Sequence, residues 1–78
     1  MYEAVIRECL AAAGLVGRYD PRHVEAWMRL EHPTLDHLSR EDFAHEVIWA
    51  TRCIDRDGVA QSELLAGSLG LIPSGRAA

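Results

Sequence analysis

The chain has 78 residues, of which 49% are hydrophobic and 26% are charged. This length excludes a second buried core, and this balance excludes a disordered chain, so we expect one globular domain. Twelve acidic residues against eight arginines give a net charge of −4. Nucleic acid is therefore not expected as the main partner, because phosphate binding requires clustered positive charge.

The same composition predicts a cytoplasmic protein. No apolar run approaches the roughly 18 residues that a transmembrane helix needs. The start, MYEAVIRECLAAAGL, carries acidic residues where a secretory signal would be basic. The two cysteines, Cys9 and Cys53, lie in separate segments, and we expect both thiols to be reduced.

The first predicted helix covers residues 2–13. One face of it is apolar and comprises Tyr2, Val5, Ile6, Cys9, Leu10 and Ala13. Gly14 can adopt the left-handed conformation that ends a helix, and Leu15 can then pack back over the last turn.

A second helix is predicted to begin at Asp20-Pro21, because aspartate caps a helix and proline is tolerated in the first turn. It runs to about Glu31, since Pro33 forces the residue before it out of helical geometry. Its expected buried residues are Val24, Trp27, Met28 and Leu30. Glu31 falls on the same side, so either the helix has ended there or its carboxylate is partly buried beside an arginine.

The next segment, PTLDHL, is a connector with room for a short fifth helical turn near residues 34–38. Ser39 then begins an approximate capping box, with Asp42 at the third helical position. The third helix runs to about Arg56, and its apolar stripe is Phe43, Val47, Ala50 and Ile54. A last helix covers about Val59 to Leu69 and ends at Gly70.

These elements predict an all-α domain, a small bundle of four helices over residues 1–71, followed by a flexible tail over residues 72–78. The expected core comprises Tyr2, Val5, Cys9, Trp27, Met28, Phe43, Val47, Ala50, Ile54 and Leu65.

The final stretch, SELLAGSLGLIPSGRAA, has the spacing of the first helix and turn of a DNA-binding helix-turn-helix. Leu65, Ala66, Leu69, Gly70 and Leu71 carry this pattern. A recognition helix of about nine residues should follow, but IPSGRAA contains a proline and a glycine that break helices. A helix that ends on a glycine accounts for the same residues.

Two further patterns suggest metal sites. Asp55, Asp57 and Gly58 resemble part of a calcium-binding loop, but Leu64 stands where that loop needs a bidentate glutamate, so we reject this site. His37, Glu41 and His45 could form a three-ligand site if the connector abuts the start of the third helix. Solvated or capping histidines explain this loose spacing better, so no metal and no cofactor is expected.

No catalytic residue is predicted. Cys9 lies on an apolar helix face, where a free cysteine acts as a small hydrophobe. Thiol catalysis at Cys53 would need a paired histidine and a lowered pKa. We therefore expect a protein that is not an enzyme.

One residue departs from the helical pattern. Trp49 projects well away from the apolar stripe of the third helix, among His45, Arg52, Cys53 and Arg56. A large aromatic residue beside arginine and histidine is a common anchor of protein interfaces. Trp49, His45, Arg52 and Arg56 are thus predicted interaction residues, with a homodimer as one outcome. The alternative is that the last helix covers Trp49 within one chain.

The stretch VEAWMRLEHPTLDHLSREDF resembles small helical proteins of bacterial genomes and prophages that have no assigned activity. The resemblance implies a bacterial or phage source and no site residue. The leading hypothesis is a non-enzymatic helical protein that acts through protein–protein interaction, such as a prophage accessory protein. The alternative is a nucleic-acid-associated regulator with a degenerate helix-turn-helix core, and the third is a small metal-binding protein or enzyme.

Overall fold

A computed structural model of the chain describes residues 2–71. This part of the chain contains four helices and no strand: α1 (Glu3–Ala12), α2 (Pro21–Glu31), α3 (Arg40–Asp57) and α4 (Val59–Ser68). The predicted all-α bundle of four helices is confirmed, and the helix ends differ from the expected ones by one residue at most.

Side-chain caps stabilise the starts of α2 and α3. The Asp20 carboxylate accepts a hydrogen bond of 2.9 Å from the backbone N–H of Arg22, and Pro21 occupies the first turn. The Ser39 hydroxyl accepts a hydrogen bond of 3.0 Å from the backbone N–H of Asp42. Both caps satisfy N–H groups that lack a carbonyl partner inside the helix, as the sequence predicted.

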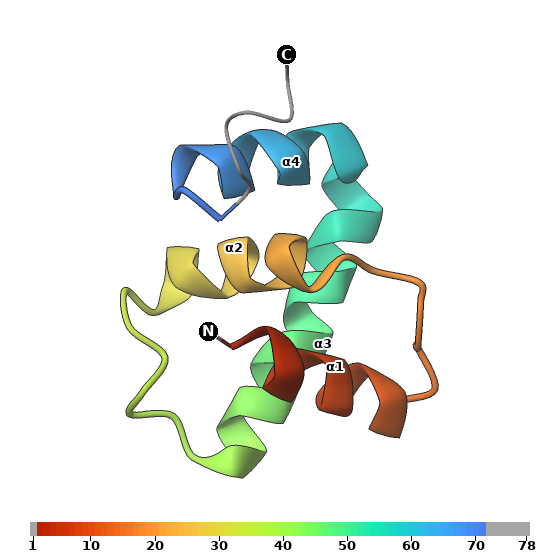
Figure 1. Cartoon of the computed structure of the whole chain (residues 1–78), viewed down its shortest axis with the longest axis vertical. Helices are drawn as coiled ribbons and strands as arrows, with labels where there is room; N and C mark the ends of the chain where they lie inside the picture. The colour runs from red at the N-terminus through yellow and green to blue at the C-terminus, as the bar shows by residue number, and fades with distance from the viewer. Residues whose placement is uncertain (1, 72–78) are drawn as a thin grey trace.

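Glycines end α1 and α3. Gly14 has a φ of 76°, and the N–H of Leu15 then donates to the carbonyl of Leu10 at 2.8 Å. This arrangement returns Leu15 to the core, as expected. Gly58 has a φ of 96° and is the only residue between α3 and α4. Because a side chain would strain this backbone, glycine permits the sharp turn between the two helices (Figure 1).

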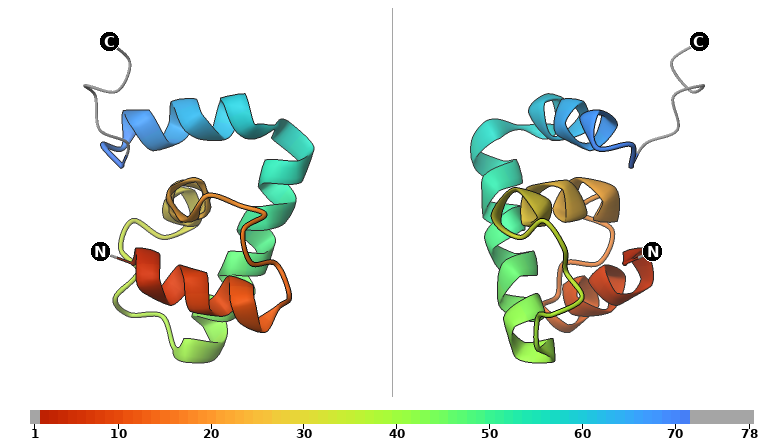
Figure 2. Two further views of the ribbon diagram at one scale, coloured as in Figure 1. Left: turned by 45° about the vertical axis from the view of Figure 1, so that its right-hand side comes forward. Right: turned by 90° about the vertical axis from the view of Figure 1, so that its left-hand side faces the viewer.

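The helices α1, α2 and α4 form three tiers, and α3 runs along one side of all three (Figure 2). The middle tier, α2, contacts each of the other three helices. Its buried residues accordingly lie on several sides of the helix: Pro21, His23, Val24, Glu25, Ala26, Trp27 and Met28.

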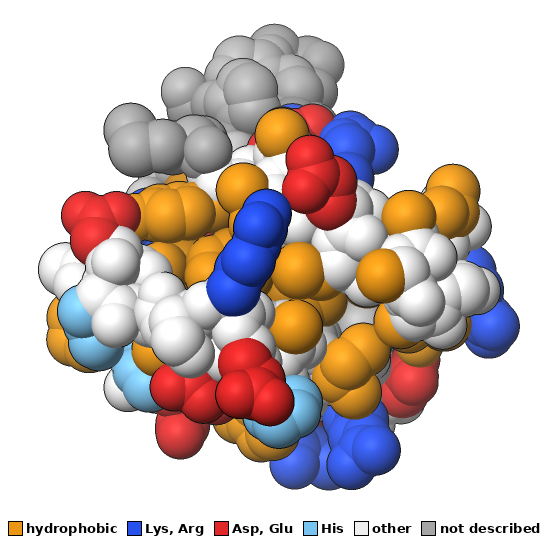
Figure 3. Space-filling model, turned by 90° about the horizontal axis from the view of Figure 1, so that it is seen from below, with side chains coloured by type: hydrophobic (Ala, Val, Ile, Leu, Met, Phe, Trp, Pro, Cys, Tyr) orange, Lys and Arg blue, Asp and Glu red, His pale blue; other side chains and the backbone are white. Residues whose placement is uncertain are grey.

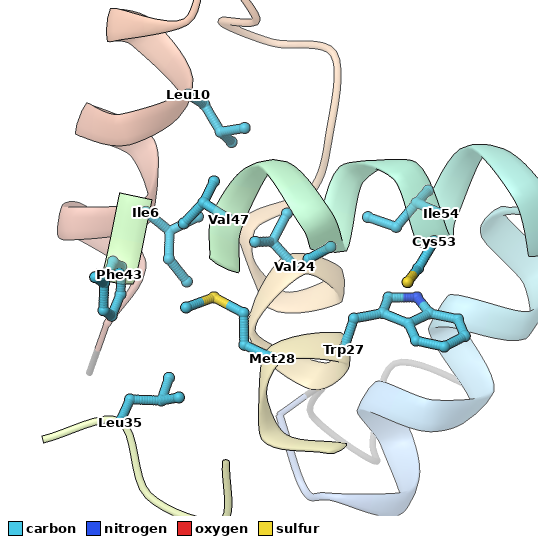
Figure 4. Close-up of a cluster of buried hydrophobic side chains, with 11 residues drawn as sticks. Ile6, Leu10, Val24, Trp27, Met28, Leu35, Phe43, Val47, Cys53 and Ile54 are labelled. Atoms are coloured by element: carbon cyan, nitrogen blue, oxygen red, sulfur yellow. The ribbon is translucent and has the colours of Figure 1, made fainter. Parts of the chain in front are cut away.

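The core lies where α1, α2 and α3 meet, and the connector closes it with Leu35 (Figure 4). Six of the predicted core residues are buried: Trp27, Met28, Phe43, Val47, Ala50 and Ile54. Tyr2, Cys9 and Leu65 are only half-buried and pack against this core.

The prediction for Val5 is wrong, because its side chain is 40% exposed. The buried line of α1 is formed by Ile6 and Leu10 instead. Leu30 is also exposed, although the sequence placed it among the buried residues of α2. Val5 lies at the edge of the apolar stripe of α1, and Leu30 lies in the last turn of α2, which ends at Glu31.

The connector forms a turn rather than a fifth helix. The N–H of Leu38 donates to the carbonyl of Leu35 at 3.3 Å, and no helix is present between α2 and α3. Buried Leu35 holds this segment against the core. The predicted tail, residues 72–78, and with it the segment IPSGRAA, lies outside the described residues. Within residues 2–71, no helix combines the length and the apolar character needed to cross a bilayer.

Candidate interaction surfaces

The outer face of α4 is apolar and uncharged. Ala60, Leu64 and Gly67 stand at i, i+4 and i+7, which places them on one side of the helix. All three are exposed, and the Leu64 side chain is 69% exposed. Their exposed neighbours on this helix are the uncharged residues Gln61 and Ser68. We call Ala60, Leu64 and Gly67 the α4 outer face.

The opposite side of α4 is held against α2, and this contact fixes the direction of the outer face. The Ser62 hydroxyl accepts a hydrogen bond of 2.9 Å from Nε1 of Trp27 and donates one of 2.9 Å to the carbonyl of Gly58. Ser62 and Ala66 are fully buried. Because these two residues face α2, Leu64 points away from the rest of the described chain.

Gly67 is the next-to-last residue of α4. Among residues 2–71, a Cβ atom at this position would meet no atom within 4 Å. Alanine would therefore fit at this position within the described structure.

Trp49 is half-buried and packs against the core from its own chain. The neighbouring Cys53 is buried, so this flank of α3 is partly covered. His45 and Arg52 are exposed, and Arg56 forms an ion pair of 3.0 Å with the adjacent carboxylate of Asp57. The interaction role of Trp49, His45, Arg52 and Arg56 stays a prediction, and the packing of Trp49 leaves it less surface to offer a partner.

The described structure does not arrange the suggested metal ligands as a metal site. His37, Glu41 and His45 are all exposed, and Nδ1 of His37 lies 3.3 Å from the Thr34 hydroxyl. Among residues 2–71, no group of three or more His, Cys, Asp or Glu side chains is arranged to hold a metal ion. The carboxylate of Asp55, from the rejected calcium loop, accepts hydrogen bonds of 2.9 Å from the Tyr19 hydroxyl.

The two thiols are poorly suited to nucleophilic chemistry. Burial, followed by the nearby Glu8 carboxylate, raises the pKa of Cys9. Burial also raises the pKa of Cys53, even though the Arg56 guanidinium acts in the opposite direction. Since the thiolate is the reactive form, both side chains are protonated at neutral pH and behave as small apolar groups.

A hollow of about 350 Å³ lies between α1, the connector and the start of α3. Half-buried Cys9 lines it together with Phe43, and charged Glu8, Asp36 and Arg40 also line it. Seen from the side of α1 and the start of α3, apolar side chains alternate with side chains of both charges (Figure 3). The face formed by α1 and the start of α3 therefore carries charges of both signs, unlike the α4 outer face.

The middle helix carries a buried ion pair that sequence reasoning missed. Glu25 is only 4% exposed, and its carboxylate lies 2.7 Å from the guanidinium of Arg29. The sequence analysis considered Glu31 for this role, but Glu31 is exposed at the end of α2. The i,i+4 spacing of Glu25 and Arg29 was the available signal.

A second missed contact joins the end of α2 to α3. Nε2 of His32 lies 3.6 Å from Oε1 of Glu46. That carboxylate oxygen is buried and has no hydrogen-bond partner among the described residues. Glu46 is thus engaged within its own chain.

Most described arginines are neutralised locally. Four of the seven form ion pairs of 2.7–3.3 Å with carboxylates: Arg7–Glu3, Arg22–Asp20, Arg29–Glu25 and Arg56–Asp57. These ion pairs reduce the positive charge that is available to bind the phosphates of a nucleic acid.

No protein-family model, no curated protein and no solved structure matches this chain. What the chain does must therefore be inferred from its own geometry.

Proposed function

We propose that this chain is a non-enzymatic helical protein that acts by binding another protein, and that the α4 outer face is its binding surface. The observation that carries the proposal is the exposure of Leu64 on a helix side without charged residues. Fully burying a leucine side chain is worth about 1.5–3 kcal/mol. A partner that covers Leu64 would gain that free energy.

The composition of the face also favours a protein partner. Depletion of charged residues distinguishes the centre of protein interfaces from ordinary surface. Between residues 58 and 71, Glu63 is the only charged residue; it is half-buried and borders the outer face beside Ala60 and Gly67. Residues 18–57 contain fifteen charged residues by comparison.

The patch around Trp49 is a second candidate surface. A half-buried tryptophan beside exposed Arg52 and His45 has the composition of an interface anchor. It ranks below the α4 outer face because part of the Trp49 ring already packs against its own core. A bacterial or prophage accessory role belongs to this proposal and rests on the sequence resemblance.

The experiment compares two exposed apolar residues. Leu64 and Val16 are each 69% exposed, but Val16 lies in the loop between α1 and α2. Tagged wild-type, Leu64→Glu and Val16→Glu proteins are used to capture partners from lysate of the source cells. A protein retained by wild type and Val16→Glu but absent with Leu64→Glu supports the proposal. Equal retention by all three proteins, or by none, contradicts it.

A further inference from the structure

We infer that α4 is a lid that opens away from α2 about Gly58 while α1, α2 and α3 remain folded, and that opening uncovers the Trp27 ring. The lid movement concerns the inner side of α4 and does not depend on the partner proposed for its outer face. Four features of the fold support it: the membership of the core, the contact between α4 and α2, the glycine between α3 and α4, and the length of α4.

The hydrophobic core is complete without α4. Within residues 2–71, none of the eleven buried residues of the core cluster lies on α4, because all of them come from α1, α2, the connector and α3. Leu65 is the residue of α4 that packs against this cluster, and it is only half-buried. Movement of α4 therefore removes no member of the cluster and leaves α1, α2 and α3 packed against one another.

The contact between α4 and α2 is made by small side chains. The buried residues of α4 are Ser62 and Ala66, and their size lets the helix lie close to α2. Because hydrophobic free energy is proportional to the apolar area removed from water, these two residues contribute much less than the leucine, isoleucine and phenylalanine side chains of the core. A hydrogen bond of 2.9 Å from Nε1 of Trp27 to the Ser62 hydroxyl adds to this contact.

Gly58 is suited to act as the hinge. It is the only residue between α3 and α4, and it is the only link between α4 and the other three helices. Its φ of 96° defines the closed position of the lid. Because glycine populates both signs of φ readily, rotation at this one residue can swing α4 away from α2 without disturbing α3.

The open lid does not remain helical. With ten residues, α4 is shorter than the roughly 12–15 residues that an isolated helix needs to be even marginally stable in water. Opening therefore exposes the backbone N–H groups of α4 to solvent. It also exposes the Trp27 ring, which is only 8% exposed in the closed structure. Tryptophan is enriched at the centres of protein interfaces, so opening presents a second apolar surface, on α2.

Hydrogen exchange of the full chain, followed by NMR, tests the lid. The backbone amides of residues 62–69 and the indole N–H of Trp27 should share one protection factor. That factor should be at least about tenfold lower than those of the Met28 and Val47 amides, which require unfolding of the core. It should also fall as urea is added below the unfolding transition, because opening exposes buried surface.

Two variants separate lid opening from unfolding of the whole domain. Ile6 is fully buried on α1, and α1 and α4 lie on opposite sides of α2 (Figure 2). Ile6→Val should lower the protection of the Met28 and Val47 amides roughly two- to tenfold and leave that of α4 unchanged, because α1 packs equally with the lid closed or open. Ser62→Ala is the control. It removes a hydrogen bond that exists only in the closed structure, so it should lower the protection of both sets by the same factor, about fivefold or more.

Three results would contradict the lid. If all four helices share one protection factor, or if Ile6→Val lowers every protection factor equally, α4 opens only when the whole domain unfolds. If protection declines gradually from residue 62 to residue 69 while the Trp27 indole stays as protected as Met28, α4 frays from its end and does not move about Gly58. If the protection of α4 is low but independent of urea, its amides exchange through small fluctuations of the closed structure.

Discussion

In the neighbouring helices α2 and α4, the helix with more charged residues is also the more deeply buried one. Of the eleven residues of α2, four are charged and one is histidine, yet seven side chains are buried. Of the ten residues of α4, one is charged, yet only Ser62 and Ala66 are buried. The difference follows from their places in the fold, because α2 is the middle tier and α4 is an outer one (Figure 2). Burial here is decided by how many neighbours a helix has, more than by how apolar its residues are.

The largest expected effect is at the centre of α2. Trp27→Ala should reduce the free energy of unfolding by about 3–5 kcal/mol, because it leaves a cavity in the core. It also removes the donor to the Ser62 hydroxyl. Urea unfolding followed by circular dichroism measures the loss. Trp49→Ala is the control, and since Trp49 is only half-buried, its cost should be clearly smaller. Equal costs would show that both tryptophans are core residues.

The buried Glu25 carboxylate of α2 should be tolerated only when it is paired with Arg29. Arg29→Met leaves the Glu25 carboxylate buried without its cation and should cost about 1–3 kcal/mol, less than for a fully buried pair because the Arg29 side chain is 32% exposed. The double variant with Glu25→Met should recover most of that loss. Denaturant titration of the single and double variants measures both quantities.

An exposed ion pair of the same geometry provides the control. Arg7 and Glu3 also lie at i,i+4 and 2.7 Å apart, but their side chains are 63% and 49% exposed. Arg7→Met should therefore change stability by no more than about 0.5 kcal/mol. If Arg7→Met costs as much stability as Arg29→Met, burial does not determine how much an ion pair of this geometry contributes.

The contact between the two helices depends on Ser62. Ser62→Ala removes the acceptor of the Trp27 indole N–H and should cost about 1–2 kcal/mol, since a buried donor is left without a partner. Ser68→Ala, at an exposed position of the same helix, should be close to neutral. Thermal unfolding of both variants tests this, and equal Tm values would show that the hydrogen bond contributes nothing.

The smallest expected effect concerns pH at the start of α2. Partial burial alone would raise the pKa of Asp20, but hydrogen bonds from the Arg22 backbone and guanidinium outweigh it and lower the pKa. An aspartate with a lowered folded-state pKa stabilises the protein above its unfolded pKa of about 3.9, and this contribution is lost as the pH falls through the folded-state pKa.

Asp20→Asn keeps a capping oxygen but removes this titration. We expect its free energy of unfolding to fall less than that of wild type between about pH 6 and pH 3, by under about 1 kcal/mol. Urea unfolding at both pH values measures the difference. Identical pH dependence in the two proteins would show that Asp20 does not contribute.

The helix boundaries could be predicted from the sequence because they depend on residues within one turn. Asp20 and Ser39 cap the N–H groups of nearby residues, and Gly14 and Gly58 adopt their backbone conformations locally. Helical periodicity likewise placed Val47 and Ile54 on the buried side of α3.

The tertiary structure alone decided which helix became the middle one. Periodicity identifies one apolar side of a helix, but it does not say whether a neighbour covers the other side. For this reason the burial of Glu25, the exposure of Leu64 and the hydrogen bond between Trp27 and Ser62 were not predicted. The last of these joins residues 35 positions apart, and no local pattern in the sequence connects them. The order of the tiers, set by the turn at Gly58 and the path of α3, determined which apolar side chains entered the core and which remained available to a partner.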